Sequence, residues 1–431
     1  MLEPAVLFLV FFGPLAFGCV EPWSLGILQA VMFSLPVLMW RRNGWPVRTA
    51  PRSILFGMAV LLALGTVQAL RPAPSDGPLP LMPFTASAAL TRKALLLWSS
   101  YAVLVWCAPN AFYSPRAGQR FSWAVVLSGF AVAVAGLIQA AHGNKFVLGF
   151  RPVGYGHSPF GPYYNNGHAA SFLAVCALMG LGLLGSMAAV AYRRARRGEP
   201  LADQVAIQAI LAVIIGIIIM ALISTHNRGS LLAFGGASLA VGLLACGLPK
   251  TPARRWGARA AILAVFLCVS AATLHGGLLQ RGAASSVPIR LSMYQSGLRL
   301  LSDAPLWGTG LGTVVAVFAP YKAPVVVGVV DHVHNDWLEL PLQAGIPAAV
   351  LLLGALALFG RRVYKSWLRE PSLERRLRIG GGLAAALCFT LHAMVEFTWQ
   401  IPANAVIFLL ILSWLWSQTT ADISLTRPNR A

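Results

Sequence analysis

Apolar runs long enough to cross a lipid bilayer recur along this chain of 431 residues. A helix needs about 20 apolar residues to span the hydrocarbon core of a membrane. Charged residues are only 11% of the sequence, so little of the chain resembles a water-soluble domain. Because helices satisfy their own backbone hydrogen bonds in lipid, the runs predict an all-α polytopic membrane protein. The twelve predicted spans lie at about residues 5–19, 23–40, 53–70, 94–108, 121–141, 168–190, 204–224, 230–248, 260–275, 340–359, 379–398 and 402–418.

The basic residues predict which loops face the cytoplasm. With the N-terminus inside, 23 of the 33 Lys and Arg fall in the inner loops and the C-terminal tail, and ten fall outside. Cytoplasmic loops of membrane proteins collect positive charge, so the split favours twelve spans with both termini inside. The first span lacks a basic leader and is expected to be retained. The net charge of +20 is then mostly a result of topology, and no nucleic-acid partner is expected, although anionic lipids are.

The chain divides into three predicted parts: N-terminal spans over 1–150, a membrane domain over 151–418, and a cytoplasmic tail over 419–431. The membrane domain includes one long outer loop, residues 276–338, which is too long for a mere connector. Within this loop, four apolar residues recur at helical spacing and predict a short helix on the membrane surface or under a lid. These residues are Leu291, Tyr294, Leu298 and Leu301.

Two further features of the sequence have structural interpretations. The Gly-rich turn at 308–312 is not expected to bind phosphate, because no strand precedes it and no Lys-Ser/Thr follows. The six Cys lie in or beside apolar stretches with no CxxC pair, which is typical of buried residues and not of disulfides or metal ligands.

The densest polar cluster on the outer side is Asp331–Asp336, just before the tenth span. A neutral imidazole of His332 or His334 could take a proton from a hydroxyl, with Asn335 orienting the base or a sugar. A His-x-His pair with carboxylates could instead bind zinc, although no helical His-Glu-x-x-His occurs. A third interpretation is a structural cluster that caps the following helix.

Two outward arginines suggest an anionic ligand. Arg228 lies in the five-residue turn between the seventh and eighth spans, and Arg290 lies at the start of the predicted surface helix. A guanidinium is charged at any relevant pH and matches phosphate with paired donors. Alternatively, either side chain could extend from the bilayer edge to water.

Several stretches together resemble the bacterial O-antigen ligase and polymerase superfamily. The ligase signature is similar to the run that begins with His334-Asn335 and reaches Gly345 after nine residues. Ala348 departs from this signature at its last position. The resemblance covers roughly residues 155–410. Its other stretches are Ser224–Gly229 with Arg228, Arg290 followed by Asp303–Gly312, Pro162–Ala169, and His392 to Ala405.

The resemblance implies a metal-independent, inverting glycosyltransferase of the multi-spanning C type, without a cofactor. Such an enzyme would act at the outer, periplasmic face of the bacterial inner membrane on a glycan linked to undecaprenyl pyrophosphate. His334 would deprotonate the acceptor sugar hydroxyl, and Arg228 and Arg290 would stabilise the leaving pyrophosphate. The remaining substrate-binding candidates are Asn335, His332, Asn165 and His168.

Three functions stay open at this point. A ligase would transfer the glycan to lipid A–core, which the signature favours, and a polymerase would transfer it to a growing glycan. A polysaccharide transporter or flippase is the alternative from another class, because His392 and Glu396 share a helical face and could couple protons. However, the ionisable groups crowd the outer side instead of the midplane. The simplest expectation for His392 and Glu396 is a structural hydrogen-bonded pair, and the alternative is a secondary contact with the acceptor.

Overall fold

The computed structural model describes residues 2–43, 50–73, 82–143, 146–148, 151–152, 158–246 and 283–425. The regular secondary structure of the described residues consists of helices and of two short antiparallel strands, β1 (Phe146–Val147) and β2 (Arg151–Pro152). Three 3₁₀ turns cover Phe17–Cys19, Ala108–Asn110 and Ala319–Tyr321. The helices are α1 (Leu2–Leu15), α2 (Pro22–Asn43), α3 (Arg52–Ala69), α4 (Ala88–Cys107), α5 (Pro115–Ala141), α6 (Asn166–Ala195), α7 (Ala202–Ser224), α8 (Arg228–Cys246), α10 (Ala283–Asp303), α11 (Val314–Val317), α12 (Asp336–Arg369), α13 (Leu373–His392) and α14 (Pro402–Leu425).

The all-α polytopic class is confirmed, while the count of twelve spans stays a prediction. Within the described residues, nine helices are long and apolar enough to cross a membrane: α2 to α8, α12 and α14. Helix α1 is apolar but has only 14 residues. Helix α13 begins with a charged turn, Glu374 to Arg376, which shortens its apolar part. The predicted span at 260–275 lies outside the described residues.

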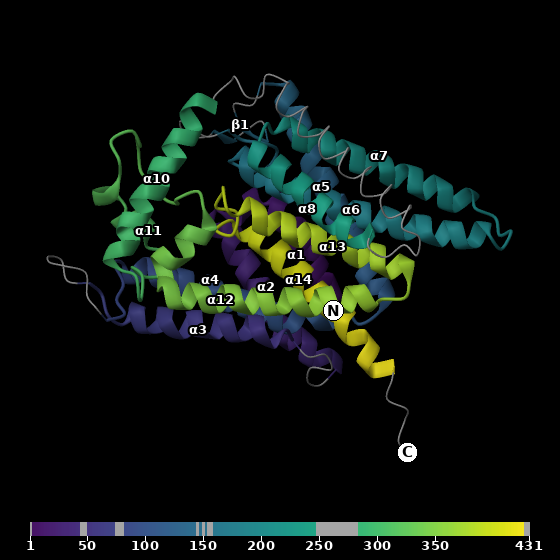
Figure 1. Ribbon diagram of the computed structural model, residues 1–431, viewed down its shortest axis with the longest axis horizontal. Helices are drawn as coiled ribbons and strands as arrows, with labels where there is room; N and C mark the ends of the chain where they lie inside the picture. The colour runs from purple at the N-terminus through teal and green to yellow at the C-terminus, as the bar shows by residue number, and fades with distance from the viewer. Residues whose placement is uncertain are drawn as a thin grey trace, which may run out of the picture.

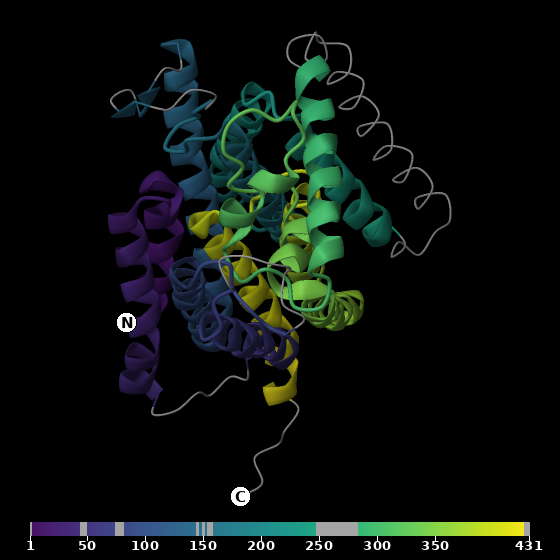
Figure 2. The ribbon, with the colours of Figure 1, turned by 90° about the vertical axis from the view of Figure 1, so that its left-hand side faces the viewer.

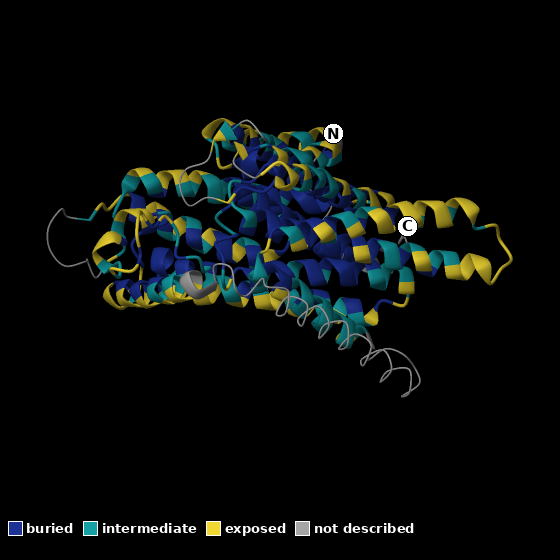
Figure 3. Ribbon diagram, turned by 90° about the horizontal axis from the view of Figure 1, so that it is seen from above, coloured by how far each residue is buried: buried dark blue, intermediate teal, exposed yellow. Residues whose placement is uncertain are grey.

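The centre of the bundle is the contact between α6 and α13. An ideal Cβ on Gly182 would lie 2.7 Å from the Cα of Gly381, so these two backbones approach as closely as only glycine permits. Helix α14 packs beside them, and 89% of its apolar span is buried. Figure 3 shows buried residues concentrated along the middle of the bundle and exposed ones at its edges and ends. The central helices therefore form a rigid frame for the loops at their ends.

Helix α12 is broken one-third of the way along. Gly345 has φ +78° and ψ 164°, which is not helical, and Pro341 and Pro347 flank it. The break frees backbone groups that must find new partners. The Gly-rich turn after α10 supplies them: Thr309 and Gly310 donate to the carbonyls of Leu342 and Gln343 at 2.9 and 3.1 Å, and Ile346 donates to Pro305 at 2.8 Å. The turn therefore supports the break in α12.

Helix α10 lies where the sequence predicts a helix, and the face that packs on the protein is not the one that carries Leu291 and Leu298. Leu291 and Leu298 are 55% and 57% exposed, whereas Met293 and Leu300 are buried. The opposite face is buried because α10 packs on the first turns of α12, where Gly297 lies against Leu338. In Figure 1, α10 runs steeply across the left end of the bundle while α3 and α12 run roughly horizontally. Figure 2 looks onto that end and shows α10 upright along it. This orientation agrees with a surface helix.

We expect Gly345→Ala to destabilise the protein by roughly 2–4 kcal/mol, because a side chain is strained at this φ and has no space. An ideal Cβ would lie 2.1 Å from the carbonyl oxygen of Leu306. The matched control is Gly354→Ala in the same helix, where nothing lies within 4 Å and stability should hold or rise slightly. Thermal unfolding of the two purified variants measures the difference. Equal melting temperatures would contradict the account of the break.

The predicted topology puts α10 outside the cytoplasm and the basic connection between α12 and α13 inside it. We expect a Cys at exposed Ser302 to react with a membrane-impermeant maleimide in cells with a permeabilised outer membrane. A Cys at exposed Lys365 should react only after the inner membrane is opened. Both variants are made in a background without the native Cys. Labelling of position 365 in cells with a closed inner membrane would reverse the topology.

Candidate functional site

The site is built where four connections meet at one end of the bundle. They are the start of α6, the α7–α8 turn, the segment Asp331–Asn335 and the connection 393–401 between α13 and α14. Asp336, which is buried, holds the last two together: its N–H donates to Ala393 at 2.9 Å, and its carboxylate accepts from the N–H of Trp399 at 2.8 Å. By the predicted topology, all four connections are on the outer side.

His334 and Arg290 share one buried carboxylate, that of Glu396. Nδ1 of His334 lies 2.7 Å from Oε1, and Nη2 of Arg290 lies 3.1 Å from Oε2. A second nitrogen of Arg290, Nη1, donates to the carbonyl of Val395 at 2.8 Å. Burial alone would raise the pKa of the Glu396 carboxyl, but the His334 hydrogen bond and the nearby positive charge hold this pKa well below its usual range. Since an ionised carboxylate only accepts, Nδ1 of His334 donates to Glu396, and Nε2 is the ring nitrogen left for a ligand.

The backbone of His334 is in the left-handed region, with φ +53°. Such a conformation costs a non-glycine residue roughly 1–3 kcal/mol and persists only where surrounding contacts impose it. Here the hydroxyl of Tyr294 on α10 donates to the His334 carbonyl at 3.0 Å, and Glu396 holds the ring. The geometry of the imidazole therefore depends on α10 as well as on the connection 393–401.

His332 has a carboxylate partner of its own, Glu339 in the first turns of α12. Nδ1 of His332 lies 2.6 Å from Oε1 of Glu339, whose side chain is fully buried. The same carboxylate accepts from the N–H of Val333 at 3.1 Å and from the amide of Gln343 at 3.0 Å. Burial alone would lower the pKa of His332, but the charge and hydrogen bond of Glu339 outweigh it and raise this pKa. His332 therefore holds its proton more tightly than a free histidine.

One aromatic ring contacts three imidazoles of the site. The ring centroid of Phe397 lies 4.5 Å from that of His168, 4.6 Å from that of His332 and 4.7 Å from that of His334. His168 is buried, and its Nε2 has no hydrogen-bond partner among the described residues. A buried polar atom without a partner is unusual and fits a ligand that supplies one. The predicted residues His168, His332 and His334 are thus brought together.

Arg228 begins α8 at the edge of this site. The preceding residue, Asn227, caps α8 by accepting from the N–H of Ser230 at 2.8 Å, and it lies 3.2 Å from Nε2 of His392. Arg228 is partly exposed and makes no ion pair with a carboxylate in the described part of the chain. It therefore has its guanidinium available. The predicted hydrogen-bonded pair of His392 and Glu396 is wrong, since His392 bonds Asn227 while Glu396 bonds His334 and Arg290.

The two asparagines among the candidates both cap helices. Asn335 accepts from the N–H of Leu338 at 3.1 Å and caps α12, and Asn165 accepts from the N–H of Gly167 at 2.7 Å and caps α6. Their side-chain oxygens are used by the fold. The capping interpretation of the Asp331–Asp336 cluster is thus correct for Asn335, while the two histidines pair with carboxylates.

The sequence did not identify Glu339, Tyr294 or Phe397 as residues of the site, and it predicted the wrong partner for Glu396. Only Glu339 had a usable signal, as an acidic residue in the first turns of a helix directly after the histidines. The described residues contain no group of three or more His, Cys, Asp and Glu arranged to hold a metal ion. His332 and His334 use Nδ1 for two different carboxylates, so these nitrogens do not converge on one ion.

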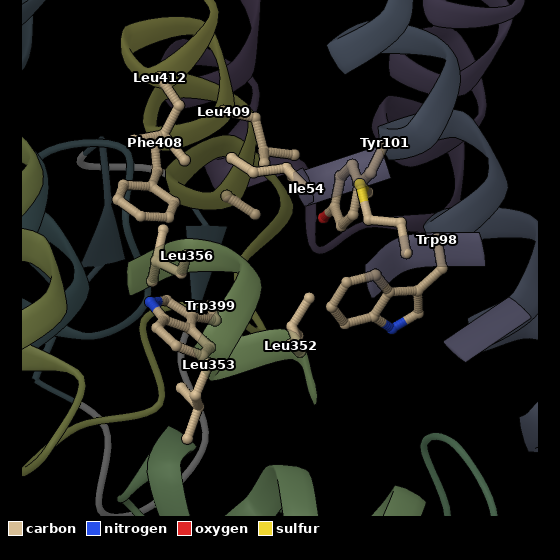
Figure 4. Close-up of a pocket in the computed structure, with 12 residues that line it drawn as sticks. Ile54, Trp98, Tyr101, Leu352, Leu353, Leu356, Trp399, Phe408, Leu409 and Leu412 are labelled. Carbon is tan, nitrogen blue, oxygen red and sulfur yellow. The ribbon is translucent and has the colours of Figure 1, made fainter. Parts of the chain in front are cut away.

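An apolar cavity of about 80 Å³ lies between α3, α4, α12 and α14, next to the site (Figure 4). Trp399 lines it and belongs to the same connection as Glu396. The hydroxyl of Tyr101 lines it too, is buried, and has no partner among the described residues. The other lining residues are Ile54, Met58, Trp98, Leu352, Leu353, Leu356, Ala405, Phe408, Leu409 and Leu412. The cavity is suited to hydrocarbon.

Comparison with known proteins supports the resemblance seen in the sequence. Residues 210–353 match the family model described as O-antigen ligase, which confirms the resemblance to that superfamily. The matched region contains Arg228, Arg290, His332, His334 and Asn335. No curated protein matches the chain. Together with the long apolar helices, the match supports a multi-pass membrane enzyme of the O-antigen ligase or polymerase type.

Proposed function

We propose that this chain, similar over residues 210–353 to O-antigen ligases, is an inverting glycosyltransferase of the bacterial inner membrane. Its donor is a glycan on undecaprenyl pyrophosphate, and its acceptor is a sugar hydroxyl on lipid A–core. The observation that carries the proposal is the bond from Nδ1 of His334 to buried Glu396, which leaves Nε2 as a base. Arg228, which pairs with no carboxylate of the described residues, supplies a cation at the edge of the same site.

The reaction is one displacement at the anomeric carbon. Nε2 of His334 takes the proton of the acceptor hydroxyl as its oxygen attacks the carbon from the face opposite the pyrophosphate. The bond between that carbon and the phosphate oxygen breaks, and its electron pair leaves with the pyrophosphate. Glu396 stabilises the imidazolium that forms, as a carboxylate does in a catalytic triad. The pyrophosphate is itself the leaving group, so the step needs no nucleotide, metal or other cofactor.

The two arginines have different parts in this proposal. Arg228 binds the pyrophosphate directly, with paired donors that match phosphate oxygens. Arg290 is partly used by Glu396 and Val395, so it holds the carboxylate in place and approaches the leaving group with its remaining N–H groups. Its side chain is about one-third exposed, which leaves it accessible to a ligand.

The apolar cavity provides a place for part of the polyprenyl chain. Its lining is almost entirely hydrocarbon and aromatic, and it adjoins the site through Trp399. A lipid whose head group lies at His334 and Arg228 could place isoprene units between α3, α4, α12 and α14. With the site on the predicted outer side, transfer would take place at the periplasmic face of the membrane.

We expect His334→Ala to reduce glycan transfer roughly 100- to 10,000-fold, because the general base is lost. Glu396→Gln should reduce it by roughly 10-fold or more, because the amide no longer fixes the tautomer or stabilises the imidazolium. Transfer is measured with purified protein, a lipid-linked glycan donor and lipid A–core at matched protein concentration.

Two control variants test whether these losses are specific. His142→Ala removes an exposed histidine at the end of α5, and Glu374→Gln breaks the ion pair of Glu374 with Arg193, 2.6 Å apart, at the other end of the bundle. Both should transfer at nearly the normal rate. Near-normal transfer by His334→Ala would exclude it as the base.

Deletion of the gene distinguishes the possible acceptors by electrophoresis of lipopolysaccharide. Loss of a ligase should leave bare lipid A–core while long glycan accumulates on undecaprenyl pyrophosphate. Core carrying one repeat unit, with no long lipid-linked chains, would identify a polymerase. Donor accumulating on the cytoplasmic leaflet would identify a flippase. An unchanged ladder together with loss of another exopolysaccharide would assign the enzyme to that glycan.

A further inference from the structure

The site contains two imidazole–carboxylate pairs that differ in charge balance. Glu396 has Arg290 as a permanent cation, so its charge is compensated without a proton on Nε2 of His334. Glu339 has no such partner in the described chain: besides His332, it accepts only from the uncharged N–H groups of Val333 and Gln343. The two histidines therefore meet different electrostatic demands although both contact Phe397.

A fully buried carboxylate needs a cation close by, because the burial of an isolated charge is costly. His332 is the group placed to supply it, at 2.6 Å from Oε1 of Glu339. The raised pKa of His332 agrees with this requirement. About a quarter of the His332 side chain remains exposed, so a charged ring is accessible to a ligand.

The other charged and titratable groups near His332 come from every neighbouring part of the site. They are Asp331 beside it, Glu339 on α12, Glu396 on the connection 393–401, His168 on α6, and His334 with Arg290. Three of these are carboxyl groups, and Arg290 is the permanent cation of the set. This surrounding favours the protonated form of His332.

We propose that His332 is a second catalytic residue, an imidazolium whose Nε2–H donates a hydrogen bond to the leaving pyrophosphate. The inference rests on the proposed function. While the acceptor proton moves to Nε2 of His334, negative charge grows on the phosphate oxygen that leaves the anomeric carbon. His332 stabilises this charge together with Arg228. His332 keeps its proton throughout, and the phosphate oxygen leaves with the bonding electrons.

Glu339 and Gln343 are positioning residues in this assignment. Glu339 holds Nδ1 of His332 so that Nε2–H points away from the carboxylate, and Gln343 holds Glu339. When two neighbouring titratable groups have different protonation states, one can act as the base and the other as the acid. His334 is then the neutral base and His332 the charged donor.

The pH dependence of transfer tests the assignment, because a merely structural His332 would not change its shape. Wild-type protein should show an alkaline limb, in which transfer falls as His332 loses its proton. His332→Gln should lower the rate near neutral pH roughly 10- to 1,000-fold and abolish the alkaline limb. Glu339→Gln should move that limb to lower pH, because it removes the charge that stabilises the imidazolium. His142→Gln is the matched control and should leave the profile unchanged.

Binding of the lipid-linked glycan gives a second readout that does not depend on turnover. Affinity for the donor should fall in wild-type protein as the pH rises and His332 loses its proton, and should be weaker but independent of pH in His332→Gln. Monodisperse elution of each variant shows that it is folded, and Glu339→Gln provides the test if His332→Gln does not fold. The inference would be overturned if folded His332→Gln kept the alkaline limb of the pH profile, or if Glu339→Gln did not move that limb. Transfer by the wild-type protein would in that case still support the proposed function. Absence of transfer by wild-type protein would instead contradict the proposed function itself.

Discussion

The candidate site depends on one buried carboxylate, that of Glu396. Its two oxygens join α10, through Arg290, to the Asp331–Asn335 segment, through His334. Because the carboxylate is about 2% exposed, its charge must be met by these partners and not by water. Glu396 therefore fixes three features at once: the position of the proposed base, the docking of the surface helix and the path of the connection 393–401. Asp336 reinforces the arrangement from the start of α12.

The membrane class and most helices could be predicted because they follow from apolar length, which is a local property of the sequence. His332, His334 and Arg228 could also be located, because rare polar residues stand out between apolar spans. The face of α10 that is buried could not be predicted, since both sides of this helix carry apolar residues. Packing on α12 decides that Met293 is buried and Leu298 is exposed. The partner of Glu396 could not be predicted either: its sequence neighbour His392 fits helical spacing, but the chain turns after α13 and takes Glu396 to His334.

The break in α12 joins two regions that look independent in the sequence. The turn at 305–312 replaces the hydrogen bonds lost at Gly345, and the N–H of Gly312 donates to Oε1 of Gln343 at 2.9 Å. The other end of the same amide, Nε2, donates to Glu339, which holds His332. A displacement of the turn would therefore reach an imidazole of the site through three hydrogen bonds.

This connection limits how the protein can diversify. A homologue that shortened or replaced the turn would have to change residues 343 and 345 as well, because neither the backbone break nor the amide would keep its partners. Exchange of the long loop between related enzymes, as a means to alter acceptor preference, would then succeed only when the first third of α12 is exchanged with it. The turn and the start of α12 must therefore change together, although Gly312 and Asn335, the cap of that helix, lie 23 positions apart in the sequence.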